Sequence, residues 1–140
     1  MIKSLILLLC TIALSSAQFI SNSSKSTVID FQTKRIWQDN DLSAEIKYTY
    51  KEAMAYCSTL GIDGKIEWRV PSQNEYMSIM DNKRIPTIQP VFSHTATGCY
   101  WTKDADKKGN PIFIDFTDGT AKVNSVSSTQ CYVRCIHDFQ

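Results

Sequence analysis

Five cysteines in a chain of 140 residues constrain the fold of this protein more than any other feature of its sequence. The first of them, Cys10, lies in an apolar run over residues 4–14, which follows Lys3 and precedes small residues at 15 and 17. This pattern predicts a secretory signal peptide over residues 1–17, with cleavage after Ala17. Such a run is too short to cross a bilayer as a helix, so we expect no transmembrane segment once the signal is removed.

Four cysteines remain after that cut: Cys57, Cys99, Cys131 and Cys135. An even number of cysteines in an exported chain predicts a disulfide framework, here with two bridges. A zinc site would need close cysteine pairs or nearby histidines as ligands. The chain has a single close cysteine pair, at C-x3-C, and its two histidines lack ligand spacing, so we expect no metal site.

The spacing of the last two cysteines limits how the bridges can run. Cys131 and Cys135 lie four residues apart in a predicted strand, which places their Cα atoms about 13 Å apart at ~3.3 Å per residue. A disulfide needs Cα atoms roughly 4.4–6.8 Å apart, so these two cysteines should not pair with each other. Two connectivities stay open: a nested one, with Cys57–Cys135 around Cys99–Cys131, and a crossed one.

The mature chain is predicted to form one domain of short strands and helices. Residues 18–26 are rich in serine and asparagine and predict a flexible lead to a domain over residues 27–140. Strands are predicted over residues 27–31, 35–38, 98–102, 112–116, 121–126 and 131–137, with a short extended segment over residues 65–70. The first two strands are predicted to form a hairpin, and Asp118-Gly119 predicts a second hairpin turn.

Two helices are predicted between these strands. Thr49 with Glu52, and Ser72 with Glu75, match the capping box that begins a helix. Gly61 stands where a glycine would end the first of the two helices. The order of elements predicts an α+β fold with two short helices and antiparallel strands.

Charge and chemistry argue against several functional classes. Fifteen basic and fourteen acidic residues give a formal net charge of +1 without a basic stripe, so we expect no nucleic-acid partner. The sequence has no G-x-S-x-G motif, and its thiols are expected in bridges. His94 lies in a polar loop and His137 near the end of the chain. We therefore predict no catalytic residues, no cofactor and no enzymatic activity.

Motifs along the chain occur in the order seen in a known family. They are Ile36-Trp37-Gln38-Asp39, Ala53-x-x-Tyr56-Cys57-x-x-Leu60, Trp68-Arg69-Val70-Pro71-Ser72-x-x-Glu75-Tyr76, Tyr100-Trp101-Thr102, Phe113-x-Asp115-Phe116-x-Asp118-Gly119 and Val133-Arg134-Cys135. From about residue 27 to 137 the chain resembles the bacterial Lcl C-terminal domain family, named after the end domain of a collagen-like surface adhesin. That family looks like a branch of the C-type-lectin-like fold, which also includes formylglycine-generating-enzyme domains.

The resemblance carries expectations about bridges and ligands. It implies the nested pairing, because the fold commonly joins its first helix to its last strand by one disulfide and has an inner one nearby. Lectins of this fold that bind sugar through calcium use oxygen ligands in a long loop and on a strand. Gln89-Pro90-Val91 has a hydrophobe at such a position, and Tyr100-Trp101-Thr102 has no carboxylate, so we expect no calcium-dependent sugar binding.

The three tryptophans are expected to differ in exposure. Trp37 and Trp68 lie in short predicted strands and are expected in the core, while Arg69 is expected to hold carbonyls or a carboxylate. Trp101 precedes the polar loop 103–110 and is expected to be partly exposed. Trp68→Ala should then cost roughly 3–5 kcal/mol, and Trp101→Ala much less.

The candidate binding residues are Trp101, Lys103, Lys107 and Lys108, since ammonium groups attract sulfate and carboxylate. The resemblance implies surface adhesion or binding of polyanionic glycans. The leading hypothesis is therefore an exported, non-catalytic module that binds anionic glycans at the bacterial envelope or surface. One alternative is a periplasmic domain that binds an envelope protein or has a structural role; another is a hydrolase whose site the sequence does not reveal.

Overall fold

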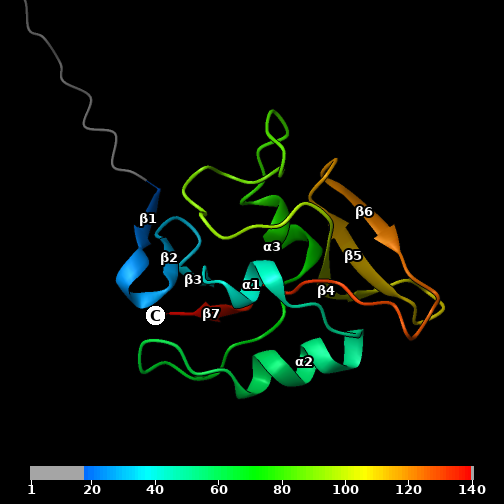
Figure 1. Ribbon diagram of the computed structural model, residues 1–140. Helices are drawn as coiled ribbons and strands as arrows, with labels where there is room; N and C mark the ends of the chain where they lie inside the picture. The colour runs from blue at the N-terminus through cyan, green and yellow to red at the C-terminus, as the bar shows by residue number, and fades with distance from the viewer. Residues whose placement is uncertain (1–17, 140) are drawn as a thin grey trace, which may run out of the picture.

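The structure, a computed structural model, describes residues 18–139, and the predicted signal peptide lies outside the described residues. Within this range, two antiparallel sheets have the strand orders β1-β2-β3-β7 and β4-β5-β6. The strands are β1 (Phe19–Asn22), β2 (Thr27–Asp30), β3 (Arg35–Gln38), β4 (Cys99–Ala105), β5 (Pro111–Asp115), β6 (Thr120–Val123) and β7 (Ile136–Asp138). The helices are η1 (Ser23–Lys25), α1 (Leu42–Glu45), α2 (Tyr50–Thr59) and α3 (Gln73–Met77). Figure 1 shows the two sheets beside each other, with α2 along one side of the molecule, and confirms the α+β class.

The segment predicted as a flexible lead over residues 18–26 differs from that prediction. It forms β1 and the short helix η1, and β1 pairs antiparallel with β2. The reason is Phe19, one of two apolar side chains within the polar composition: its ring packs edge-on against Phe92, with centroids 6.1 Å apart, whereas Ile20 is exposed.

The predicted hairpin of β2 and β3 is confirmed, with Val28 opposite Trp37. The buried carboxylate of Asp30 closes its turn by accepting a hydrogen bond from the hydroxyl of Thr33 at 2.6 Å. The last strand, β7, is shorter than the predicted one over residues 131–137 and pairs antiparallel with β3. The end of the chain therefore returns to the first sheet.

Both predicted helix starts are confirmed as capping boxes. At α2, the hydroxyl of Thr49 accepts the backbone N–H of Glu52 at 3.3 Å, and the Glu52 carboxylate accepts the N–H of Thr49 at 2.9 Å. At α3, Ser72 and Glu75 make the same exchange at 3.1 and 2.7 Å. No helix within residues 18–139 is long and apolar enough to cross a membrane.

The end of α2 and the helix α1 depart from the prediction. Leu60 leaves α2 through extended backbone at φ −67° and ψ 137°, so Gly61 does not end the helix in a left-handed conformation. The single turn α1 is an additional helix, and Asp41 before it makes no side-chain cap. A four-residue helix without a capping side chain offers no sequence signal.

Strand β4 separates two hydrophobic cores. Tyr100 and Trp101 are neighbours on β4 and both fully buried, and successive strand side chains point to opposite faces. The core that contains Tyr100 also includes Val28, Trp37, Tyr76, Ile79, Ile88, Phe92, Ile114, Phe116 and Ile136. The core that contains Trp101 also includes Ile36, Ala53, Cys57, Ile62, Trp68, Val70, Cys131, Val133 and Cys135.

Two disulfides join segments that are distant in the chain. Cys57 pairs with Cys135 at a Cα–Cα distance of 5.5 Å, and Cys99 pairs with Cys131 at 5.1 Å. This confirms the nested pairing that the resemblance implies. The bridges close loops of 78 and 32 residues. In the chain-entropy model each contributes on the order of 4 kcal/mol, which is a large share of a typical domain's stability.

Candidate functional site

The four candidate binding residues lie in three different places. Trp101 lines a pocket beside α2, whereas Lys103, two residues further along β4, lines a second pocket beside α3. Lys107 and Lys108 are exposed at the tip of the β4–β5 hairpin and line neither pocket. The structure therefore places these residues along β4 and its hairpin but does not gather them into one patch.

Trp101 is fully buried, so the expectation of partial exposure is wrong. Its indole N–H donates to the backbone oxygen of Tyr48 at 2.7 Å. The rings of Tyr50 and Phe113 pack edge-on against it, with centroids 5.6 and 6.1 Å away. The cause is the packing of α2 against β4, which covers the indole although the polar hairpin begins only two residues later.

The pocket beside α2 has a volume of about 230 Å³ and is here called the Tyr50 pocket. Its lining is Tyr50, Lys51, Trp101, Asn110, Pro111, Asn124, Ser125, Val126 and Ser127. Most of its surface is apolar, and amide and hydroxyl groups join it from the hairpin and from the chain after β6. Ligand pockets commonly combine an apolar surface with a few polar groups that fix orientation.

Unpaired lysines lie at this pocket and along the hairpin. In the part of the chain that the structure describes, no carboxylate lies within 4.0 Å of the ammonium groups of Lys51, Lys103, Lys107 or Lys108. The carboxylate of Asp106 instead serves the hairpin turn, because it accepts the backbone N–H groups of Asn110 and Lys108, each at 2.9 Å. These hydrogen bonds lower the pKa of Asp106.

A second, more open pocket of about 410 Å³ is lined by Arg35, Arg69, Ser72, Asn74, Glu75 and Lys103. Arg69 donates two hydrogen bonds to Glu75, at 2.7 and 2.6 Å, and two to Asp138, at 3.1 and 3.2 Å. This confirms that Arg69 holds carboxylates. Burial raises the pKa of Glu75, but hydrogen bonds from Arg69 and from the backbone of Ser72 outweigh that effect and lower it to about 2.

Glu75 should make the stability of the fold depend on acidity. Its pKa falls from the ordinary 4.5 to about 2 in the folded protein, so the carboxylate stabilises the fold above pH 4.5 and loses that contribution as the pH falls towards 2. We expect the difference in free energy of unfolding between the parent and Glu75→Gln to be largest near neutrality and to narrow across this range. Urea denaturation at several pH values measures it. A difference that stays constant down to pH 2 would contradict the assignment.

A buried arginine fastens the loop that precedes β4. Arg134 is fully buried and donates to Asp39 at 3.1 Å, to the hydroxyl of Thr95 at 2.7 Å, and to the backbone oxygens of Gln38 and His94. Burial raises the pKa of Asp39, but the charge of Arg134 and hydrogen bonds from the loop backbone outweigh it, so the net shift is downward.

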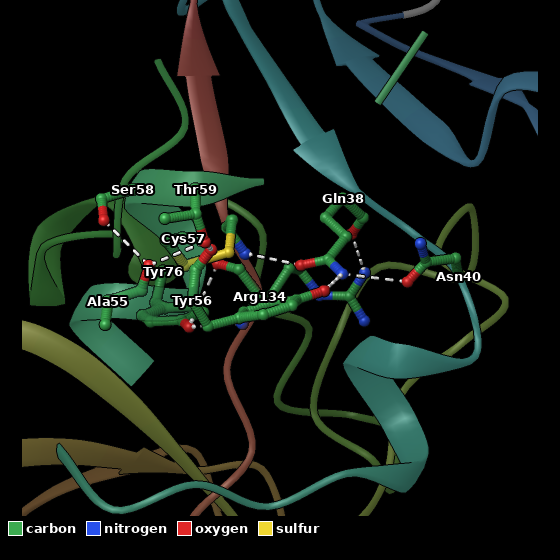
Figure 2. The surroundings of a disulfide bond; sticks show 10 residues. Gln38, Asn40, Ala55, Tyr56, Cys57, Ser58, Thr59, Tyr76 and Arg134 are labelled. Carbon is green, nitrogen blue, oxygen red and sulfur yellow. Dashed lines mark hydrogen bonds between the residues drawn. A yellow bond between two sulfur atoms is a disulfide. The ribbon is translucent and has the colours of Figure 1, made fainter. Parts of the chain in front are cut away.

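The same region is tied to the Cys57–Cys135 disulfide. The side-chain amide of Gln38 accepts the backbone N–H of Cys135 at 3.0 Å and donates to Asn40 and Tyr56, each at 2.9 Å. Figure 2 shows Gln38 and Arg134 reaching towards each other beside this bridge. Sequence reasoning missed this cluster because its members are far apart in the chain.

Ser93, His94 and Asp39 lie together but not as a catalytic triad. A triad needs a histidine between the serine hydroxyl and the acid. Here the Ser93 hydroxyl donates directly to Asp39 at 3.0 Å, while the two ring nitrogens of His94 lie 3.7 Å from Asp39 and 3.3 Å from Asp41. The Nδ1 atom of His94 lies 3.5 Å from the Ser93 hydroxyl, a longer contact than the 3.0 Å hydrogen bond from that hydroxyl to Asp39. Residues 18–139 also contain no cluster of three or more side chains suited to a metal ion.

Comparison with known proteins adds one finding to this geometry. The model of the Lcl C-terminal domain matches residues 26–137, which is about four-fifths of the chain. No curated protein matches the chain.

Proposed function

Because the chain belongs to the Lcl C-terminal domain family, we propose that it is an exported binding module without catalytic activity, which binds anionic glycans at the bacterial envelope or surface. The observation that carries this proposal is the Tyr50 pocket with its unpaired lysine, Lys51. Two disulfides support export, because such bridges persist in oxidising compartments. Their nested positions also support the C-type-lectin-like fold that the resemblance implies.

The Tyr50 pocket suits one sugar ring better than a larger ligand. Its volume of about 230 Å³ lies below the usual range for drug-sized ligands, roughly 300–1,000 Å³. The apolar side chains of Tyr50 and Val126 offer contacts for the C–H groups of a ring, and Asn110 and Ser127 offer hydrogen bonds to its hydroxyls. Lys51 adds a charge for a carboxylate or sulfate on the same sugar or its neighbour.

The lysines of the hairpin support an anionic ligand. Lys107 and Lys108 are exposed and unpaired within the described chain, so they extend the positive charge beyond the pocket. Attraction between exposed charges is screened within about 8 Å at physiological salt. Retention on immobilised heparin should therefore fall steeply with modest added salt if the hairpin contributes.

The arrangement of nucleophiles supports a non-catalytic role. All four cysteines of the described chain are in disulfides, and the Ser93 hydroxyl donates to Asp39 at 3.0 Å, a shorter contact than the 3.5 Å that separates it from Nδ1 of His94. These thiols and this hydroxyl thus have structural roles in the fold.

The proposal is tested by two valine substitutions that differ only in position. Val126 lines the pocket and is 56% exposed, while Val123 on β6 is 53% exposed and does not line it. We expect Val126→Asp to weaken glycan binding at least about tenfold, since the new carboxylate occupies the apolar surface and repels an anionic sugar. Val123→Asp should bind as the parent does. Both changes are at exposed positions and should leave stability within about 0.5 kcal/mol.

A panel of neutral and acidic oligosaccharides, with heparin as the polyanion, supplies the probes for this comparison. Equal binding by the two variants would place the ligand elsewhere. Absence of binding to the whole panel, together with capture of a protein from envelope extract, would favour the protein-binding alternative. Shortened oligosaccharides after incubation would favour the hydrolase alternative.

A further inference from the structure

The pocket beside α3 differs from the Tyr50 pocket in chemistry and in the elements that form it. It lies where the start of β3, the segment leading into α3, and the middle of β4 come together. Its lining is polar, and none of the residues that line the Tyr50 pocket takes part in it. It is here called the Arg35 pocket.

The carboxylate that lines this pocket, that of Glu75, is already occupied. Both oxygens of Glu75 accept hydrogen bonds from Arg69, and one of them also accepts the backbone N–H of Ser72 at 2.7 Å. The Nε atom of Arg35 lies 2.8 Å from the other oxygen as an ion pair, although its N–H is not aligned for a hydrogen bond. Only 8% of Glu75 is exposed. The carboxylate is thus turned away from solvent and saturated by its partners.

Asp138 and Asp104 are the other acidic groups beside the pocket, and each has a partner. Asp138 accepts from Arg69 at 3.1 and 3.2 Å and lies 3.6 Å from Arg35. Asp104, next to Lys103, accepts the backbone N–H of Gln73 at 2.7 Å.

The donors, in contrast, are open. Across residues 18–139, no hydrogen bond engages the terminal nitrogens of Arg35, the ammonium group of Lys103 or the side-chain amide of Asn74. The ion pair at its Nε atom fixes the position of the Arg35 guanidinium, while within the described chain its two terminal nitrogens keep their N–H groups free to donate to a ligand. A pocket with free donors, whose carboxylate is saturated by its partners, selects a ligand that brings oxygens and negative charge.

We propose that the Arg35 pocket binds an oxyanion, a sulfate or carboxylate group, between the guanidinium of Arg35 and the ammonium group of Lys103. The fork of a guanidinium matches two oxygens of such a group, and a lysine adds a point charge from a second direction. The assignment of that oxyanion to an acidic sugar rests on the proposed function. The site itself rests on the lining of this pocket.

Titration of the exported protein with sodium sulfate, against sodium chloride at equal ionic strength, tests the site by NMR. We expect saturating shifts of the Arg35 Nε–H and of the backbone amides of residues 72–74 with sulfate only. Arg35→Gln and Lys103→Gln should each weaken sulfate binding at least about tenfold. Lys107→Gln removes an exposed lysine outside the pocket and should change nothing. Lys103→Gln keeps the Arg35–Glu75 contact, so its effect does not depend on the integrity of that ion pair.

N-acetylglucosamine 6-sulfate and uncharged N-acetylglucosamine distinguish the sources of the oxyanion. Binding of the sulfated sugar, lost in Lys103→Gln, would support an acidic glycan. Binding of inorganic sulfate alone would assign the pocket to a free anion and overturn the glycan assignment. Shifts that are equal in chloride, or unchanged in both variants, would overturn the site. The valine comparison at the Tyr50 pocket is independent of these outcomes, so either proposal can fail without the other.

Discussion

Replacing Arg134 with methionine is expected to lower the free energy of unfolding by about 3–5 kcal/mol, because it leaves the carboxylate of Asp39 buried without its partner. Arg134 is fully buried, and Asp39 is 4% exposed. The guanidinium also binds two backbone oxygens and the hydroxyl of Thr95, and each of these would lose its donor. Urea denaturation with the disulfides intact measures the loss.

A double variant separates the charge from the lost packing. Asp39→Asn removes the negative charge and keeps an oxygen that can accept the backbone N–H groups of Ser93 and His94. The double variant should therefore lose less free energy of unfolding than the sum of the losses measured for the two single variants. The 3.1 Å contact between Arg134 and Asp39 predicts that the two losses are coupled. If the losses of the single variants instead added up to that of the double variant, the two residues would act independently and the prediction would be wrong.

This ion pair has a structural consequence for the loop before β4. Asp39 follows β3 and accepts from the loop residues Ser93 and His94, while Arg134 holds the loop carbonyl of His94 and the hydroxyl of Thr95. The two charged side chains together therefore fasten this loop to the end of β3 and to the segment before β7.

Local signals were sufficient for the parts of the fold whose chemistry lies within a few residues. The capping boxes at Thr49 and Ser72 satisfy backbone groups three residues away, and the structure places both helix starts there. The β5–β6 hairpin follows from Asp118-Gly119, where the glycine has φ 76°. Local signals did not determine the disulfide pairing. The spacing of Cys131 and Cys135 excluded one of the three possible pairings, and the family resemblance was needed to choose between the other two.

Features that depend on distant partners were not predictable from the sequence. The cluster of Arg134, Gln38 and Asp39 spans about 95 residues of the chain, and no local pattern announces it. The polar composition of residues 18–26 also gave a wrong prediction at β1, because the contact of Phe19 with Phe92 is made to a residue distant in the chain.

The candidate site was predicted only in part, for a geometric reason. Lys103 and Lys107 are near in sequence, but the pairing of β4 shifts register between Trp101 and Ala105, so the strand does not carry its residues in simple alternation. The hairpin then takes Lys107 away from both pockets. Val126 and Tyr50 carried no sequence signal of a ligand site, because Val126 follows the exposed strand β6 and Tyr50 is simply the first residue of a predicted helix.

Trp101→Ala and Trp68→Ala are expected to destabilise the protein by similar amounts, each about 3–5 kcal/mol. Trp101 is 0% exposed and Trp68 2%, and both belong to the core cluster around the disulfides. Each indole N–H also donates to a backbone oxygen, of Tyr48 for Trp101 at 2.7 Å and of Lys65 for Trp68 at 2.9 Å. Truncation therefore removes the same kinds of contact at both sites. Thermal and urea denaturation of the two variants, with disulfides intact, measure the comparison.

Trp101→Phe distinguishes packing from a role in the pocket. It keeps an aromatic ring between Tyr50 and Phe113 but removes the hydrogen bond to Tyr48, so it should cost less than the alanine variant. If the Tyr50 pocket binds sugar through Tyr50 and Val126 on a base formed by Trp101, the phenylalanine variant should retain most glycan binding. Parent-like melting of Trp101→Ala would contradict the burial of Trp101. Parent-like stability of Trp101→Phe with complete loss of glycan binding would instead show that the indole itself contacts the ligand.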